Sequence, residues 1–139
     1  MEERWRTFDH TADLGLEEEA GTPARLFACA ALAVLAQVAE CERPVEEVTR
    51  ELTAEGGDAA ALLVDWLNRA LVAAELAAAV WTRVEIGRFD GRTLTARLWG
   101  PRRDRTRMTY LREVKAVSHH GLELELSPGR CRCRIVLDL

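Results

Sequence analysis

Hydrophobic side chains recur along this chain with two spacings, and the change between them separates expected helices from expected strands. Residues 24–41 and 59–78 carry apolar side chains every three or four positions, as an amphipathic helix does when one face is buried. Thr22 and Asp58 stand just before these runs, where a side-chain oxygen can accept a hydrogen bond from a free helical N–H group. The pattern predicts two helices that each bury one face.

Alternation of apolar and polar residues predicts strands through most of the remaining chain. The expected strands cover residues 4–8, 14–19, 45–53, 80–89, 93–98, 114–118, 122–126 and 131–138. Asp90-Gly91, His119–Gly121 and Ser127–Gly129 interrupt the alternation and predict turns. We therefore expect a single α+β domain over residues 1–139, with a largely antiparallel β-sheet and both helices packed on one face.

Composition and charge narrow the classes of function. The 139 residues are 48% hydrophobic and 30% charged, as in an ordinary globular domain, and the net charge is −4. Because the chain is acidic overall, any contact with nucleic acid has to come from a local basic patch. No stretch approaches the roughly 18 apolar residues of a membrane span, and the first residues lack the apolar core of a signal peptide. We expect a cytoplasmic location and no membrane partner.

The four cysteines favour packed thiols over a metal site. Cys29, Cys41, Cys131 and Cys133 do not show the paired Cys-x-x-Cys spacing of zinc sites. Cys131 and Cys133 are two positions apart in an expected strand, so both thiols should lie on one face. We expect reduced thiols inside the protein.

Oxygen ligands gather at two places in the sequence. One stretch near the N-terminus contains Asp9 and Asp13, and the last expected strand ends in Asp138 and the terminal carboxylate of Leu139. Carboxylates are hard ligands, which suit calcium, magnesium or manganese better than zinc or copper. If the two places meet, about three negative charges repel one another and favour a bound cation. In an alternative interpretation, Asp9 and Asp13 are turn and capping residues.

The basic residues leave two interpretations open. The run at residues 102–107 lies in an expected loop, and its arginines, including Arg102, Arg103 and Arg105, either are solvated or form a surface for phosphates or acidic protein patches. Lys115 has an acidic neighbour in an expected strand and reads most simply as half of a surface ion pair.

Catalytic motifs are missing from the sequence. Imidazole suits a hard cation poorly, so structural hydrogen bonds are the expected role of His10 and His119. The chain has no Gly-rich phosphate loop and no G-x-S-x-G nucleophile elbow. The residues therefore indicate no self-contained catalytic machinery.

Several motifs together resemble the archease family. They are residues 9–15 (DHTADLG), 26–28 (LFA) in an Ala-rich helix, 61–68 (ALLVDWLN), 113–120 (EVKAVSHH) and 136–139 (VLDL). Their order and spacing span essentially the whole chain, which makes the resemblance more specific than any one motif.

The resemblance implies a small cofactor protein rather than an enzyme. Archeases activate an RtcB-type RNA ligase in tRNA splicing and RNA repair by promoting its guanylylation and turnover. The resemblance implies a divalent metal on Asp13, Asp138 and Leu139, with calcium expected and magnesium or manganese as alternatives, whereas Asp9 stands where the family pattern varies. It also implies that Lys115 belongs to the functional surface and contacts a nucleotide phosphate or a ligase carboxylate. Indirect contact with guanine nucleotide or tRNA is a further expectation.

Two other functions stay open from the residues alone. A metal-dependent phosphoesterase could use the same carboxylates, but the sequence offers no second metal site or general base. A chaperone-like modulator that binds RNA or protein could act through the basic loop at residues 102–107.

Overall fold

The computed structural model describes residues 2–10, 13–43 and 45–139, without the side chains of Asp9 and His10. In chain order, its elements are β1 (Arg4–His10), β2 (Asp13–Ala20), α1 (Pro23–Val38), β3 (Ala39–Cys41), β4 (Val48–Glu55), α2 (Ala59–Ala77), β5 (Arg83–Phe89), β6 (Thr93–Gly100), β7 (Met108–Tyr110), β8 (Ala116–Ser127) and β9 (Arg130–Asp138). Within the described residues, all paired strands are antiparallel.

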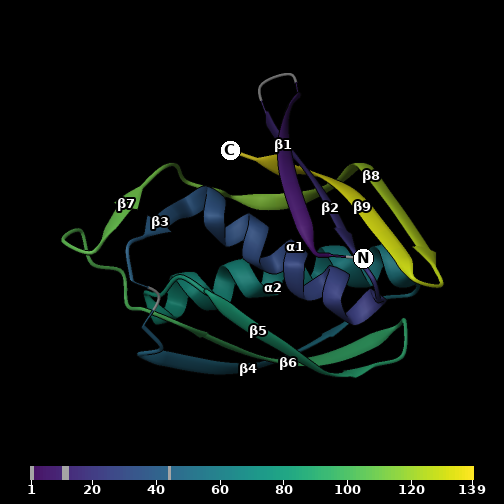
Figure 1. Ribbon diagram of the computed structural model, residues 1–139, viewed down its shortest axis with the longest axis horizontal. Coiled ribbons are helices and arrows are strands. Elements are labelled where there is room, and N and C mark those ends of the chain that lie inside the picture. The colour runs from purple at the N-terminus through teal and green to yellow at the C-terminus, as the bar shows by residue number, and fades with distance from the viewer. Residues whose placement is uncertain (1, 11–12, 44) are drawn as a thin grey trace.

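Both helices lie between two antiparallel sheets (Figure 1). The four-stranded sheet has the order β1-β2-β9-β8, the three-stranded sheet has the order β4-β6-β5, and β3 and β7 form a short separate pair. α1 packs against β2 and β5, and α2 packs against β4 and β8, so each helix contacts both sheets. The predicted α+β fold, with antiparallel strands and both helices on one face of a sheet, is confirmed. A second sheet, which the pattern did not predict, covers the helices from the other side.

The helices begin at the predicted caps. The Arg25 N–H group donates to the Thr22 hydroxyl at 3.2 Å, and the Ala61 N–H group donates to the Asp58 carboxylate at 2.8 Å. Each cap satisfies one of the N–H groups that the first helical turn leaves without a partner. In the described residues, neither helix is long and apolar enough to cross a membrane.

The core fills the space between the sheets, where tryptophans join the elements. Trp66 is fully buried, and its indole N–H donates to the Phe27 carbonyl of α1 at 2.9 Å. The Trp81 indole, also buried, donates to the Ala70 carbonyl of α2 at 3.0 Å. Each indole therefore packs in the core while its one polar group is bonded.

The first helix is shorter than predicted, because it ends at Val38 and not at Cys41. The Leu111 N–H group donates to the Val38 carbonyl at 2.9 Å, and the Arg112 guanidinium donates to the Gln37 carbonyl at 3.0 Å. A distant segment thus satisfies carbonyls of the last turn, and the chain leaves as β3 to pair with β7. These two strands were not predicted, since such short segments carry little alternation.

The predicted turn at His119–Gly121 is wrong. β8 continues through these residues, and its register against β9 shifts between Ser118 and Glu123. Gly121 has a φ of +73°, a conformation that glycine adopts readily inside such an irregularity. The observed strand β8 begins at Ala116, later than the predicted strand at residues 114–118. Lys115 therefore precedes β8 and does not lie within a strand.

Candidate functional site

Asp13 and Asp138 lie at one end of two neighbouring strands of the four-stranded sheet. β2 and β9 are antiparallel, and their register pairs Leu14 with Leu137. Continued by one residue, that register sets Asp13 opposite Asp138 on the same face of the sheet. The carboxylate of Leu139 follows directly. The first residues of β1 lie at the other end of the sheet, so the C-terminus meets the first hairpin and not the N-terminus itself (Figure 1).

The second helix holds this end of the sheet through Asn68. The Asn68 side chain donates to the Val117 carbonyl at 3.1 Å and accepts from the Val117 N–H group at 2.8 Å. Val117 pairs with the residue that precedes Asp138 in β9, and the Lys115 N–H group donates to the Asp138 carbonyl at 2.9 Å. The helix motif that contains Asn68 therefore positions the backbone that carries Asp138.

The donor set at this end suits a hard cation. Asp13 is half-buried, while Asp138 and Leu139 are exposed, so a ligand can approach from solvent. Carboxylate oxygens are the ligands that calcium and magnesium prefer, and water completes such coordination shells. No three side chains of His, Cys, Asp or Glu in the described residues are arranged to hold a metal ion. The candidate site instead combines two side chains with the chain terminus.

Gly15, next to the candidate site, leaves room for an aromatic ring. A Cβ atom on Gly15 would lie 2.1 Å from the Phe8 ring of the paired strand. The Arg134 guanidinium covers that ring, 3.9 Å from its centroid. The glycine of the N-terminal motif therefore has a packing role in the sheet.

The middle of the same sheet face pairs opposite charges. The Arg6 side chain donates to Glu17 at 2.6 Å, and Arg132 donates to Glu125 at 2.8 Å. The hydrogen bond from the Arg4 side chain holds the pKa of Glu19 below its ordinary value. Carboxylates in this part of the face are therefore neutralised by arginines of the sheet itself.

The basic residues of the predicted functional surface differ in their surroundings. The Arg103 guanidinium donates to the Glu75 carboxylate of α2 at 2.9 Å. Arg102 and Arg105 are exposed in the same loop, and Lys115 is exposed beside the candidate metal site. Arg103 and Lys115 line one groove, so the structure connects part of the basic loop with the end of the sheet.

Glu18 is a buried titratable residue that the sequence analysis missed. Its side chain lies on the inner face of β2 and is 1% exposed. The Cys133 thiol donates to Glu18 Oε2 at 2.9 Å, while Oε1 has no partner among the described residues. Burial raises the pKa of Glu18 to about 8. The sequence signal that could have identified Glu18 as buried was its position in the strand alternation, between Leu16 and Ala20, which both face inward.

The remaining candidate ligands add nothing to this site. The four cysteines are free thiols, and Cys131 and Cys133 are both buried, as predicted. Burial raises the pKa of Cys29 to about 12, which keeps that thiol protonated. His119 is exposed in the irregular part of β8, and the side chains of Asp9 and His10 lie outside the described part of the structure.

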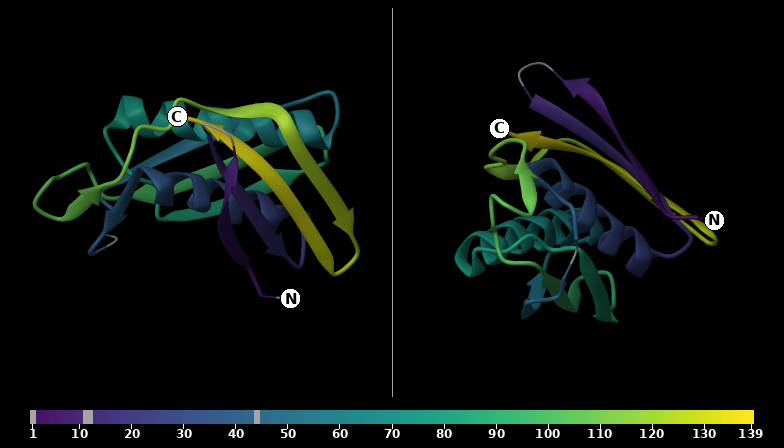
Figure 2. Two further views of the ribbon diagram at one scale, coloured as in Figure 1. Left: turned by 90° about the horizontal axis from the view of Figure 1, so that it is seen from above. Right: turned by 60° about the vertical axis from the view of Figure 1, so that its left-hand side comes forward.

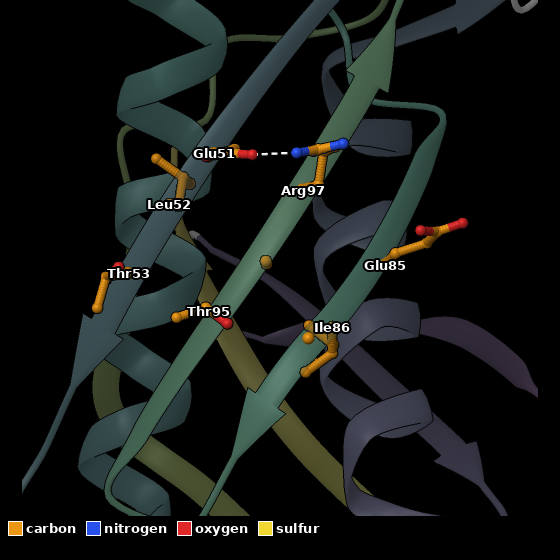
Figure 3. Close-up of a pocket in the computed structure, with 9 residues that line it drawn as sticks. Glu51, Leu52, Thr53, Glu85, Ile86, Thr95 and Arg97 are labelled. Atoms are coloured by element: carbon orange, nitrogen blue, oxygen red, sulfur yellow. Dashed lines mark hydrogen bonds and ion pairs between the residues drawn. The ribbon is translucent and has the colours of Figure 1, made fainter.

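A hollow of about 390 Å³ lies on the outer face of the three-stranded sheet. Figure 3 shows the Glu51–Arg97 ion pair, which joins β4 and β6 across it, and Thr95 nearby on β6. Thr95 Oγ1 accepts a hydrogen bond from the Arg88 N–H group at 2.9 Å. These polar groups are already bonded, so we assign no chemistry to this hollow.

Two helices enclosed by antiparallel sheets, with the first hairpin beside the last strand, define an α+β class of small domain that solved structures share. The solution structure of Methanobacterium thermoautotrophicum protein 1598 matches with a TM-score of 0.76 and 28% identity, covering 97% of this chain and 98% of that one. The crystal structure of a Thermotoga maritima archease, described as a possible chaperone, matches with a TM-score of 0.66 over 96% of each chain. Its identity is 20%, so this likeness concerns the fold alone.

Sequence comparison gives the family. The profile of the Archease protein family (MTH1598/TM1083) matches residues 5–139. The protein archease of Methanopyrus kandleri is 32% identical over 140 residues, which cover 97% of this chain and 99% of that relative. The protein archease of Pyrococcus abyssi is 28% identical, with 98% and 99% covered. The chain belongs to the archease family, and the resemblance drawn from its motifs is confirmed.

Proposed function

We propose that this archease is a metal-binding accessory protein, which activates an RtcB-type RNA ligase in the cytoplasm by promoting its guanylylation and turnover. The observation that carries the proposal is the register of β2 and β9, which sets Asp13 opposite Asp138 beside the Leu139 carboxylate. Membership of the archease family supports the assignment to tRNA splicing and RNA repair. The chemistry of the donor set supports the metal.

Each residue at this end has a proposed role. Asp13, Asp138 and the Leu139 carboxylate hold the ion, with calcium expected and magnesium or manganese as alternatives. A bound divalent ion supplies positive charge for phosphate oxygens. The exposed Lys115 ammonium, on the segment that bonds to the Asp138 backbone, binds a phosphate of guanine nucleotide or a carboxylate of the ligase.

The basic loop has a divided role in this proposal. Arg103 is held by Glu75, so we assign it to the structure of the loop. Arg102 and Arg105 are exposed, and we assign surface contacts with tRNA or with the ligase to them. Neutralising both should make activation of the ligase less sensitive to salt concentration, because salt screens the contacts that exposed cations make.

A ligation assay tests the proposal. Trace guanylylated ligase is incubated with RNA ends and GTP, and the products formed per ligase are counted with and without this protein. We expect the wild-type protein to raise the number of turnovers, and Asp13→Ala or Asp138→Ala to abolish the increase without loss of the folded circular dichroism signal. Glu123→Ala, which removes an exposed carboxylate from the same sheet away from its end, should stimulate fully.

The outcomes separate the metal from the partner. Full stimulation by Asp138→Ala would contradict the role of the metal site, whereas no stimulation by the wild-type protein would contradict the ligase as partner. Hydrolysis of a nucleotide by the purified protein alone would favour the metal-dependent phosphoesterase instead.

A further inference from the structure

Large apolar side chains are exposed together where α2 ends. Leu76 and Val72 are 84% and 57% exposed and lie one turn apart on the helix. Tyr110, the last residue of β7, and Leu111, the first residue of the connection from β7 to β8, are exposed as well. A single exposed apolar residue is ordinary, but a group contributed by two elements marks an interaction surface.

A groove of about 630 Å³ separates these two elements. Leu71 and Val72 line it from α2, Tyr110 lines it from the end of β7, and Leu111 and Val114 line it from the connection to β8. Figure 2 shows the chain after β7 passing beside the end of the chain marked C before it continues as β8. The groove therefore has one helical wall and one extended wall.

Hydrogen bonds fix the extended wall. The Leu111 N–H group donates to the Val38 carbonyl at 2.9 Å. Arg112 Nη1 donates to both the carbonyl and the side-chain oxygen of Gln37, at 3.0 Å each. The wall is tied to the end of α1, so the groove exists before a partner binds and little ordering cost opposes binding.

The charges around the groove favour an acidic partner. Arg103 is paired with Glu75. Arg112 is bonded only to neutral acceptors, and the Lys115 ammonium has no hydrogen bond or ion pair with the described residues. Three cations therefore line the groove against two anions, Glu75 and Glu113, in a chain whose net charge is −4. Cations without an internal carboxylate partner are available to carboxylates of another protein.

We propose that this groove, together with the exposed Leu76 one turn beyond Val72 on α2, binds an amphipathic helix of the RNA ligase. Apolar residues of that helix one turn apart lie against Val72, Leu76 and Leu111, and its carboxylates lie against Arg112 and Lys115. A helix fits as the occupant, because Val72 and Leu76 form a ridge on α2. Such a ridge packs between rows of side chains on a second helix. The inference rests on the proposed function, since it names the surface by which the same ligase is bound.

The groove is continuous with the candidate metal site. Lys115 lines the groove with its side chain, and its N–H group donates to the Asp138 carbonyl. A helix seated here would bring its own protein to the end of β9. The groove supplies affinity through buried apolar area, and the ion binds outside the groove, at the carboxylates of the sheet end.

Ligase binding by a charge-inserting variant tests this surface. Val72→Lys combined with Leu76→Lys places two charges on exposed positions near a helix C-terminus, where lysine is well tolerated. Val45→Lys, at an exposed apolar residue outside the groove, is the matched control. We expect calorimetry to show ligase binding weakened by roughly tenfold or more in the double variant, as on loss of buried apolar anchors. The double variant on its own should bind calcium with unchanged affinity. The Val45→Lys control should bind the ligase as the wild-type protein does.

The outcomes distinguish the groove from the function on which it rests. Unchanged ligase binding by the double variant would overturn the groove while leaving the proposed function in place. Failure of the wild-type protein to bind the ligase at all would overturn both. Concentration-dependent self-association of the wild-type protein that the double variant loses would show that a second copy, and not the ligase, occupies the groove.

Discussion

The four-stranded sheet arranges its carboxylates differently at its middle and at its end. In the middle, Glu17 of β2 lies between Arg6 of β1 and Arg134 of β9, with nitrogen–oxygen distances of 2.6 and 3.7 Å. At the end, the register of the same strands sets Asp13 opposite Asp138. Opposite charges across a ladder stabilise a sheet, and like charges destabilise it. In our proposal, a bound cation stabilises the end of the sheet as the arginines stabilise its middle.

Glu18 shows a third arrangement, one residue from Glu17. It faces the core, where burial raises its pKa to about 8 and where the Cys133 thiol is the one group that bonds to it within the described part of the chain. Carboxylates in this sheet are thus neutralised by arginine in the middle, by a proton inside, and, in our proposal, by a metal ion at the end. Four predictions test these three cases.

Glu18→Gln should have the largest effect, and it tests the protonated case. The unfolded chain loses this proton near the ordinary value of 4.5, whereas the folded protein keeps it to about pH 8. Between these values the folded state binds more protons, so the free energy of unfolding should fall as pH rises, by up to about 1.4 kcal/mol per pH unit. The variant should lose this dependence of the free energy of unfolding on pH. Near the pKa of Glu18 in the folded protein, the variant should be more stable than the wild-type protein. Urea unfolding across this range measures both, and equal slopes would show that Glu18 ionises normally.

Asp138→Asn tests the end of the sheet. Calcium at about 100 times its dissociation constant should raise the free energy of unfolding of the wild-type protein by about 2.7 kcal/mol, and that of the variant by much less. In chelator, the variant should be at least as stable as the wild-type protein, because one of the like charges at this end of the sheet is gone. Calorimetric melting with calcium and with chelator measures both differences. A melting temperature of the wild-type protein that ignores calcium would contradict the account.

Asn68→Ala tests how the end of the sheet is positioned. The change leaves the buried Val117 N–H and carbonyl groups without their side-chain partner, which should cost about 1–3 kcal/mol of unfolding free energy. Calcium should also bind more weakly, because α2 no longer holds the part of β8 that pairs with the end of β9. Arg69→Ala, on the exposed side of the same helix, is the control and should change little. Equal losses in the two variants would show that Asn68 has no special part.

Glu17→Gln should have the smallest effect, since it removes one carboxylate from the charge-paired middle. Surface ion pairs contribute little, so the loss in unfolding free energy should stay below about 1 kcal/mol. The stabilisation by calcium should match that of the wild-type protein. A calcium effect lost in this variant would place the ion in the middle of the sheet.

Local patterns predicted the elements well, and distant contacts explain where they failed. Thr22 and Asp58 cap the two helices as predicted, since a cap depends only on the next few residues. The end of α1 could not be predicted in this way, because Leu111 satisfies its last turn from far along the chain. The groove between α2 and the β7–β8 connection has the same origin, so no local pattern indicated it.

The candidate site was predicted through its motifs more than through its chemistry. Asp13 and Asp138 could be named because oxygen ligands gather in these two stretches of the sequence, and the family motifs gave the two stretches a shared role. Glu18 was overlooked although alternation placed it inward, because a carboxyl group is rarely buried so completely. Only the structure shows that a single thiol contacts it.

The most direct test of the central claim is a crystal structure determined with calcium, with anomalous data collected at long wavelength. The account predicts one anomalous peak at the end of the four-stranded sheet, about 2.3–2.6 Å from carboxylate oxygens of Asp13, Asp138 and Leu139. Saturating calcium with no peak at these carboxylates, or with its peak elsewhere on the protein, would contradict it.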